Sequence, residues 1–149
     1  MSLTRRTLLI SAPLAALVAG RALAMSPQIY AEDGIAVDGS DVVAYFTQGM
    51  PVAGSADISY DWMGATWLFS TEENRDMFAA TPDAYAPQFG GYCAYAVSQG
   101  YTAPTIPEAW RIVDGKLYLN FSLRAQELWL QDVPGNIAKG NANWPGVLN

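Results

Sequence analysis

Short hydrophobic runs alternate with polar residues along the chain, and glycine or proline separates many of them. The segment Ile58–Phe69, broken by Met63-Gly64, predicts a hairpin of two strands. The segment Trp110–Phe121, broken by Asp114-Gly115, predicts a second hairpin, because Asp-Gly is a strong two-residue turn signal. The apolar run Val42–Phe46 predicts a further strand.

Other segments have helical features. Ser70 is placed as an N-cap three residues before a glutamate, which predicts a helix over about residues 71–80. A proline-initiated short helix is expected over 82–85, a helix capped by Ser122 follows the second hairpin, and short helix potential lies at 137–139. We therefore expect an α+β fold in which a small antiparallel sheet of hairpins packs against a few short helices.

The first two dozen residues have the features of a secretion signal. Arg5-Arg6 directly precede an apolar run from Leu8 to Ala19, and Ala22-Leu23-Ala24 gives a small-x-small cleavage pattern. The apolar run is too short to span a bilayer, which takes about 20 residues. Residues 1–24 are thus interpreted as a twin-arginine signal peptide. The protein is expected to use the twin-arginine export machinery and to reside in the periplasm.

Removal of this segment leaves residues 25–149, which fit a single domain. Five basic residues then remain against all fourteen acidic ones, an excess of nine negative charges. Phosphate binding needs a positive patch, so a nucleic-acid partner is not expected. No later segment has the length and apolar character of a membrane span, so none is expected in the mature protein.

The chain contains one cysteine, Cys93, and no histidine. Histidine-dependent hydrolysis, zinc binding by imidazole and histidine proton transfer are therefore excluded. Cys93 lies in the segment Gly90–Tyr95 and has no second cysteine with which to form an internal disulfide. A free thiol in an oxidising compartment has to be buried, bound to a ligand, or used in exchange with another molecule.

Three interpretations of this region remain open. Copper(I) accepts thiolate and thioether ligands, so Cys93 with Met50, Met63 or Met77 forms a candidate copper site, although methionine also commonly fills cores. Tyr92 and Tyr95 are candidate ligand or interface residues. Alternatively, Cys93 is a small buried hydrophobic residue.

Several segments together resemble the YHS domain proteins, in particular an exported, stand-alone branch with a Gly-Gly-Tyr-Cys-Ala-Tyr segment. The resemblance covers about residues 35–146. The matching segments are Gly39–Phe46, Trp67–Ser70, Phe78, Pro82, Tyr85, Pro87 and Gly90–Tyr95. Small YHS domains resemble treble-clef metal-binding modules and occur beside copper pumps and diiron hydroxylases, which implies metal handling.

The usual cysteines of the small YHS domains are missing from this chain. The corresponding segments, Asp41–Phe46 and Phe69–Asn74, contain none. The structural metal site of those relatives is therefore not transferred, and the resemblance implies the fold alone.

The resemblance and the export signal together predict an accessory or binding module in metal or redox homeostasis, with copper as the candidate metal, rather than an enzyme. Its expected partners are a metal ion or a periplasmic protein. A thiol-dependent oxidoreductase using Cys93 is the alternative, and it would have to form mixed disulfides because no resolving cysteine exists. A third candidate is a non-catalytic partner-binding domain.

Overall fold

The computed structural model describes residues 25–149, and the expected signal peptide lies outside these residues. The described chain is a mixture of helices and strands, which confirms the predicted α+β class. The strands are β1 (Ala31–Glu32), β2 (Ile35–Ala36), β3 (Ser55–Trp62), β4 (Ala65–Phe69), β5 (Trp110–Val113) and β6 (Lys116–Leu119). The α-helices are α1 (Val42–Thr47), α2 (Glu72–Ala80), α3 (Pro82–Tyr85), α4 (Ala94–Ser98), α5 (Leu123–Leu130) and α6 (Val133–Asn143). The 3₁₀ turns are η1 (Val37–Gly39), η2 (Gln88–Gly91) and η3 (Gly146–Leu148).

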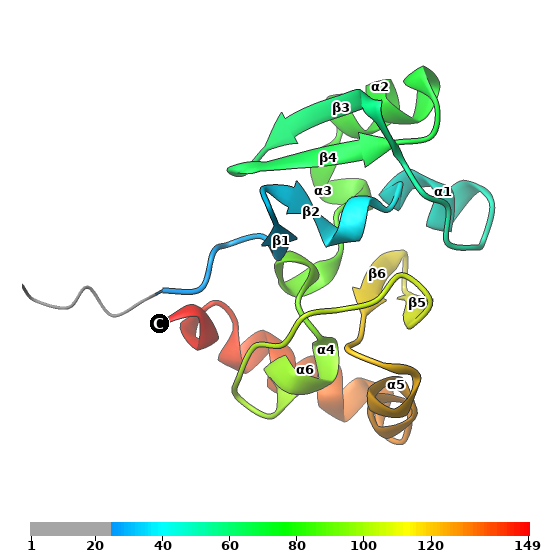
Figure 1. The fold of residues 1–149 in the computed structure, drawn as a ribbon. Helices are drawn as coiled ribbons and strands as arrows, with labels where there is room; N and C mark the ends of the chain where they lie inside the picture. Colours follow the sequence, from blue (N-terminus) through cyan, green and yellow to red (C-terminus); the bar gives the residue numbers. More distant parts are fainter. Residues whose placement is uncertain (1–24) are drawn as a thin grey trace, which may run out of the picture.

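The elements separate into two ends of the molecule. Figure 1 shows β3, β4 and α2 at one end, α4, α5 and α6 at the other, and β5 and β6 beside the helical end. The segment that contains α3, η2 and α4 runs from the first end to the second. None of the helices within residues 25–149 has the length and apolar character to cross a membrane.

The larger sheet has the strand order β1-β2-β4-β3, and β5 and β6 form a separate antiparallel pair. Both predicted hairpins are present, at β3–β4 and β5–β6. Their turns, Met63-Gly64 and Asp114-Gly115, have positive φ at both residues, as expected for tight two-residue hairpins. The sheet also contains one parallel pairing, between β2 and β4, which local sequence patterns did not predict.

Val42–Phe46, predicted to be a strand, is instead part of helix α1. The preceding Asp41 starts the helix, since its Oδ1 accepts hydrogen bonds from the backbone N–H groups of Val43 (3.0 Å) and Ala44 (3.2 Å). Val42 and Val43 are fully buried in this helix. The strand propensity of valine is therefore overridden by a side-chain cap and by tertiary packing.

The predicted helix after the first hairpin is present as α2, but its N-cap is Thr71 rather than Ser70. Thr71 Oγ1 accepts the N–H of Asn74 at 3.1 Å. Ser70 instead donates its hydroxyl to Asp41 Oδ2 at 2.6 Å, which ties the end of β4 to the start of α1. The C-terminal helix α6 is longer than the short segment expected at residues 137–139.

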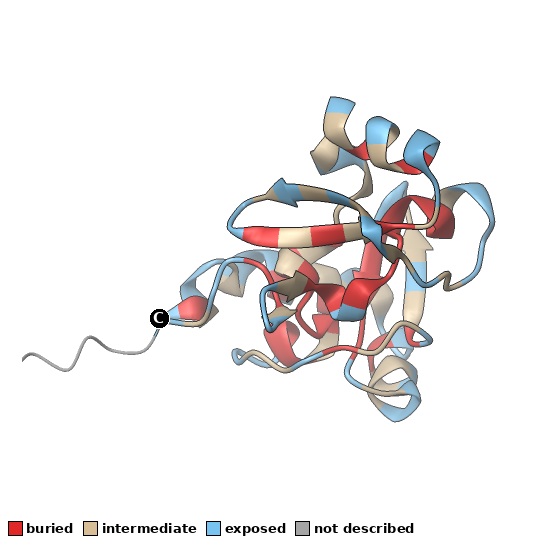
Figure 2. Cartoon of the chain, turned by 45° about the horizontal axis from the view of Figure 1, so that its top comes forward, coloured by how far each residue is buried: buried red, intermediate tan, exposed pale blue. Residues whose placement is uncertain are grey.

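Buried aromatic side chains fill both ends of the molecule. Phe78 of α2 packs on Trp67 and Phe69 of β4, with ring centroids 5.1 Å apart in each pair. At the helical end, Tyr118 packs on Trp129 at 5.1 Å. Figure 2 shows the alternation of buried and intermediate residues along β4 that this packing produces.

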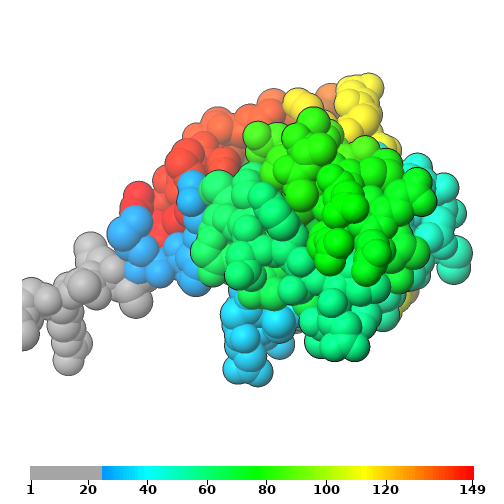
Figure 3. Space-filling view, turned by 90° about the horizontal axis from the view of Figure 1, so that it is seen from above, coloured from blue at the N-terminus to red at the C-terminus, as the bar shows by residue number. Residues whose placement is uncertain are grey.

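The first and last described segments lie side by side. The Ser26 N–H donates to the Leu148 carbonyl at 2.8 Å. Figure 3 shows the chain just after residue 24 in blue, against the C-terminal segment in red. Residues of the β3–β4 hairpin, α2 and α3 form the green surface that faces the viewer in the same figure.

Candidate functional site

Cys93 lies between η2 and α4, where the backbone is closely packed. Gly90 and Gly91 both have positive φ, and a Cβ on Gly91 would overlap the side chain of Val37. The Gly90 carbonyl also accepts the Tyr30 N–H at 2.8 Å. The glycine pair is therefore explained by close approach of the backbone to the N-terminal segment of the domain.

The Cys93 side chain is 1% exposed, but polar groups contact its sulfur. Sγ accepts a hydrogen bond from the Ala96 N–H at 3.4 Å, which makes Cys93 the N-cap of α4. Sγ also donates to Asn120 Oδ1 at 3.5 Å. The thiol therefore acts both as a hydrogen-bond donor and as a hydrogen-bond acceptor. Cys93 is thus a buried thiol with polar partners, which an apolar core residue does not need.

Asn120, directly after β6, is the second member of this site. Its backbone is held on both sides: its N–H donates to the Ala109 carbonyl (2.9 Å), and its carbonyl accepts the Ile106 N–H (3.1 Å). Its side-chain Oδ1 also accepts the Tyr95 N–H at 3.0 Å. This contact defines which end of the amide faces Tyr95 and Cys93, because an Nδ2 at that position would meet another donor.

The Asn120 Nδ2 atom has no hydrogen-bond partner among residues 25–149, although the residue is 0% exposed. Buried amide groups are almost always paired, so this orphaned donor is unusual. It belongs to the same amide group as the oxygen that contacts Cys93 Sγ.

An irregular segment, Thr102–Ala109, packs against the backbone around Cys93. The Cys93 N–H donates to the Ala103 carbonyl at 3.0 Å, and Thr105 Oγ1 donates to the Gly91 carbonyl at 2.8 Å. Together with the bonds to Asn120, these contacts attach the segment to both sides of the site.

The two tyrosines flanking the cysteine have different environments. Tyr92 is 7% exposed, and its hydroxyl donates to the Pro27 carbonyl at 2.7 Å. Burial raises the pKa of this phenol above its ordinary value, so it remains a donor at neutral pH. Tyr95 is half-buried. The interface role of this pair stays a prediction. For Tyr92, the hydroxyl that would contact a partner is already bonded to the Pro27 carbonyl.

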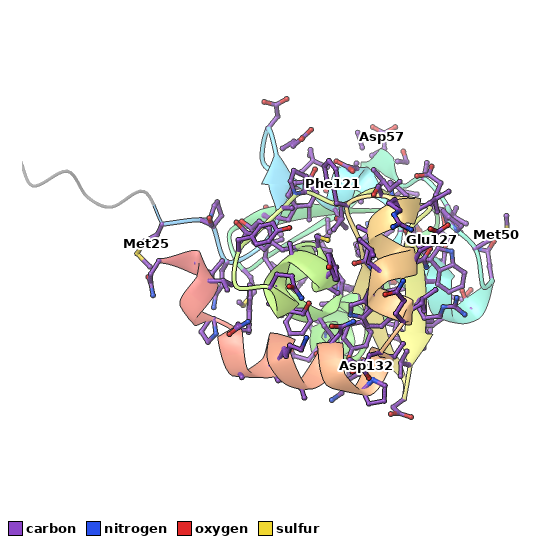
Figure 4. The ribbon with its side chains drawn as sticks, turned by 90° about the horizontal axis from the view of Figure 1, so that it is seen from below. Met25, Met50, Asp57, Phe121, Glu127 and Asp132 are labelled. Atoms are coloured by element: carbon purple, nitrogen blue, oxygen red, sulfur yellow. The ribbon has the colours of Figure 1, made fainter. Side chains whose placement is uncertain are left out.

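The methionines of the candidate copper site lie on separate elements. Met50 (53% exposed) is in the loop after α1, Met63 (43% exposed) is in the β3–β4 turn, and Met77 packs against the core from α2. Figure 4 shows Met50 at the periphery, directed away from the centre of the molecule. No methionine is a hydrogen-bond neighbour of Cys93 Sγ among the described residues.

Met63 instead lines a cleft between the β3–β4 turn, η2 and the segment after α6. This cleft, of about 180 Å³, is also lined by Trp62, Asp83 and Trp144, whereas Cys93 is not among its lining residues. Within the described chain no three histidine, cysteine or acidic residues are placed to bind a metal ion. Copper binding by Cys93 and these methionines remains a prediction.

Sequence reasoning identified Cys93 but missed Asn120. The two residues are separated by 27 positions, and only the fold brings them together. One signal was present in the sequence: Asn120 stands between Leu119 and Phe121 in a predicted strand, where a buried polar residue needs a partner.

One family of known proteins matches part of the chain. A model of the YHS domain matches residues 43–89, from α1 into η2, so the chain contains a YHS domain in this region. No curated protein and no solved structure matches the chain. The Cys93–Asn120 pair lies beyond the matched span, in the part of the fold formed by α4 and the second hairpin.

Proposed function

We propose that this protein is an exported, periplasmic YHS-domain module that acts in metal or redox homeostasis through the Cys93 thiol. The paired arginines and cleavage pattern within residues 1–24 support export. The YHS match supports a role in metal handling, with which this domain is often associated. The export features and the YHS match are both compatible with a small binding or accessory protein.

The observation that carries the role of Cys93 is its polar environment. A cysteine that only fills space is surrounded by hydrocarbon, whereas this sulfur has the Ala96 N–H and the Asn120 amide as neighbours. Fixed polar groups beside a sulfur can stabilise a changed state of that sulfur, either bound to a soft metal ion or oxidised.

The test uses mature protein recovered from the periplasm, whose first residue we expect to be Met25 by mass spectrometry. The folded protein is titrated with copper(I) against a chromogenic chelator and, separately, with hydrogen peroxide while the free thiol is counted. We expect at least one of these reagents to react with the wild-type thiol. Cys93→Ser, which keeps a hydrogen-bonding group at the N-cap, is expected to react with neither. Identical behaviour of the two proteins toward both reagents would overturn the proposal.

A thiol-dependent oxidoreductase is the second candidate, and the unpaired Nδ2 of Asn120, whose Oδ1 contacts the sulfur, favours it. Because residues 25–149 contain no other cysteine, turnover would require a thiol from another molecule. Repeated peroxide consumption in the presence of excess small thiol distinguishes this enzyme from a stoichiometric module, which would react once per chain.

A further inference from the structure

We propose that Cys93 and Asn120 form a site for a single oxygen atom: hydrogen peroxide oxidises the thiol to a sulfenic acid, and Asn120 Nδ2 donates a hydrogen bond to the new oxygen. This inference rests on the redox form of the proposed function and gives it a substrate class and a product.

The arrangement of donors and acceptors supports this assignment. Asn120 Oδ1 already accepts hydrogen bonds from Cys93 Sγ and the Tyr95 N–H, whereas Nδ2 has no partner among the described residues. Nδ2 belongs to the same amide as the Oδ1 that contacts Sγ, so an oxygen added to the sulfur on the Nδ2 side of this amide would meet the free donor. The oxidised state then satisfies a buried amide that the reduced state leaves unpaired.

Burial of the sulfur indicates the class of oxidant. Cys93 is 1% exposed, and the segment Thr102–Ala109 bonds to the backbone of Cys93, Gly91 and Asn120. Hydrogen peroxide is close to water in size, whereas a disulfide such as oxidised glutathione brings bulky groups to the sulfur. Enclosure of this kind favours the small oxidant.

The reaction balances with peroxide as the only co-reactant. The sulfur attacks one peroxide oxygen as a thiolate, and the proton that the thiol gives up passes to the departing oxygen. An S–O bond forms as the O–O bond breaks. The departing hydroxide takes up a proton and becomes water, so sulfur is oxidised by two electrons and peroxide is reduced.

The product is expected to persist. A sulfenic acid normally condenses with a nearby thiol, but residues 25–149 contain no second cysteine. The burial of Cys93 also slows the approach of an external thiol to this oxygen. A long-lived sulfenic acid, released by a small external thiol, is the expected state after oxidation.

The experiment compares wild type with Asn120→Asp, which keeps the size of the side chain and an acceptor for Tyr95 while removing the Nδ2 donor. After one pulse of hydrogen peroxide, samples are unfolded at successive times in the presence of dimedone, and the trapped sulfenic acid is quantified by mass spectrometry. We expect the lifetime of the wild-type sulfenic acid to be about tenfold longer than that of the variant, the effect of about one hydrogen bond.

Asn136→Asp is the matched control, because Asn136 is also buried and its Nδ2 donates to the Trp129 carbonyl at 2.8 Å, away from the sulfur's own hydrogen-bond partners. This variant should keep the wild-type lifetime. Equal lifetimes in wild type and Asn120→Asp would overturn the Asn120 assignment and leave the proposed function standing. Absence of sulfenic acid in the wild type would overturn the inference, and copper(I) binding would then decide the proposed function separately.

A measurement on wild type alone covers the case in which Asn120→Asp does not fold. In ¹H–¹⁵N spectra, the Asn120 side-chain amide resonances should shift when peroxide is added, since one proton gains an acceptor. Unchanged resonances in a chain that is fully oxidised at Cys93 would rule out the hydrogen bond.

Discussion

At the scale of single residues, the fully buried Asp41 carboxylate connects three elements. Its Oδ1 caps α1, while Oδ2 accepts the Ser70 N–H (2.9 Å), the Ser70 hydroxyl and the Asn74 Nδ2 group (2.9 Å). A buried charge is tolerated here because five donors surround it. The carboxylate therefore holds the start of α1, the end of β4 and the first turn of α2 together.

Asp41→Ala should lower the free energy of unfolding by about 3–5 kcal/mol, because several buried donors lose their acceptor at once. Urea denaturation at neutral pH measures this loss. Asp57→Ala is the control: Asp57 is exposed on β3, as Figure 4 shows, and its removal should change stability by less than about 0.5 kcal/mol. A small effect at Asp41 would mean that water replaces the carboxylate.

At the scale of elements, the packing of α6 depends on the absence of a side chain at Gly140. A Cβ at this position would lie 2.6 Å from the Phe89 ring. Helix α6 thus approaches η2 closely enough to contact the aromatic residue that precedes the glycine pair. Phe89 itself has positive φ, so the ring is presented by a constrained backbone with little room to move away.

Gly140→Ala should therefore destabilise the protein by about 1–3 kcal/mol through overpacking, although alanine favours an ordinary helix interior. Thermal unfolding provides the measurement. Gly146→Ala in η3 is the matched substitution, since a Cβ there would meet no neighbouring atom within 4 Å and the φ of Gly146 is not positive. A Gly140→Ala protein as stable as Gly146→Ala would contradict the close packing.

The elements that could be predicted from the sequence are those with local signals. Met63-Gly64 and Asp114-Gly115 specify tight hairpin turns because both residues of each pair adopt a positive φ. Pro82 starts α3. Val42–Phe46 was wrongly predicted to be a strand, because its helix depends on Asp41, whose carboxylate is fixed by residues far along the chain. The pairing of β2 with β4 and the contact of Cys93 with Asn120 likewise arise only from tertiary structure.

At the scale of the whole molecule, buried phenols limit stability at alkaline pH. Burial raises the pKa of Tyr45 to about 12, and burial also raises the pKa values of Tyr30, Tyr92 and Tyr118. Each of these groups prefers the protonated form in the folded state more than in the unfolded state. Their contribution to the free energy of unfolding is complete below the pKa of a phenol in the unfolded chain, about 10. It is lost as the pH rises through the pKa of the same phenol in the folded protein.

Tyr45 alone should account for a loss of about 2–3 kcal/mol between pH 10 and 12. Tyr45→Phe should make the decline shallower, and at pH 8 it should cost about 1 kcal/mol because the Pro107 carbonyl loses its donor. Urea denaturation at pH 8, 10, 11 and 12 tests both effects. Tyr101→Phe, at an exposed position, should follow the wild-type decline, and an equal decline in Tyr45→Phe would refute the assignment.

The bond between the Ser26 N–H and the Leu148 carbonyl has a practical consequence for the topology of the chain. Because the beginning and end of the folded part are adjacent, a short glycine-rich linker could join them without crossing the protein surface. New termini could then be opened at the exposed Gly49 loop. A circularly permuted protein of this design would change the order in which the elements are synthesised while keeping the folded structure around Cys93.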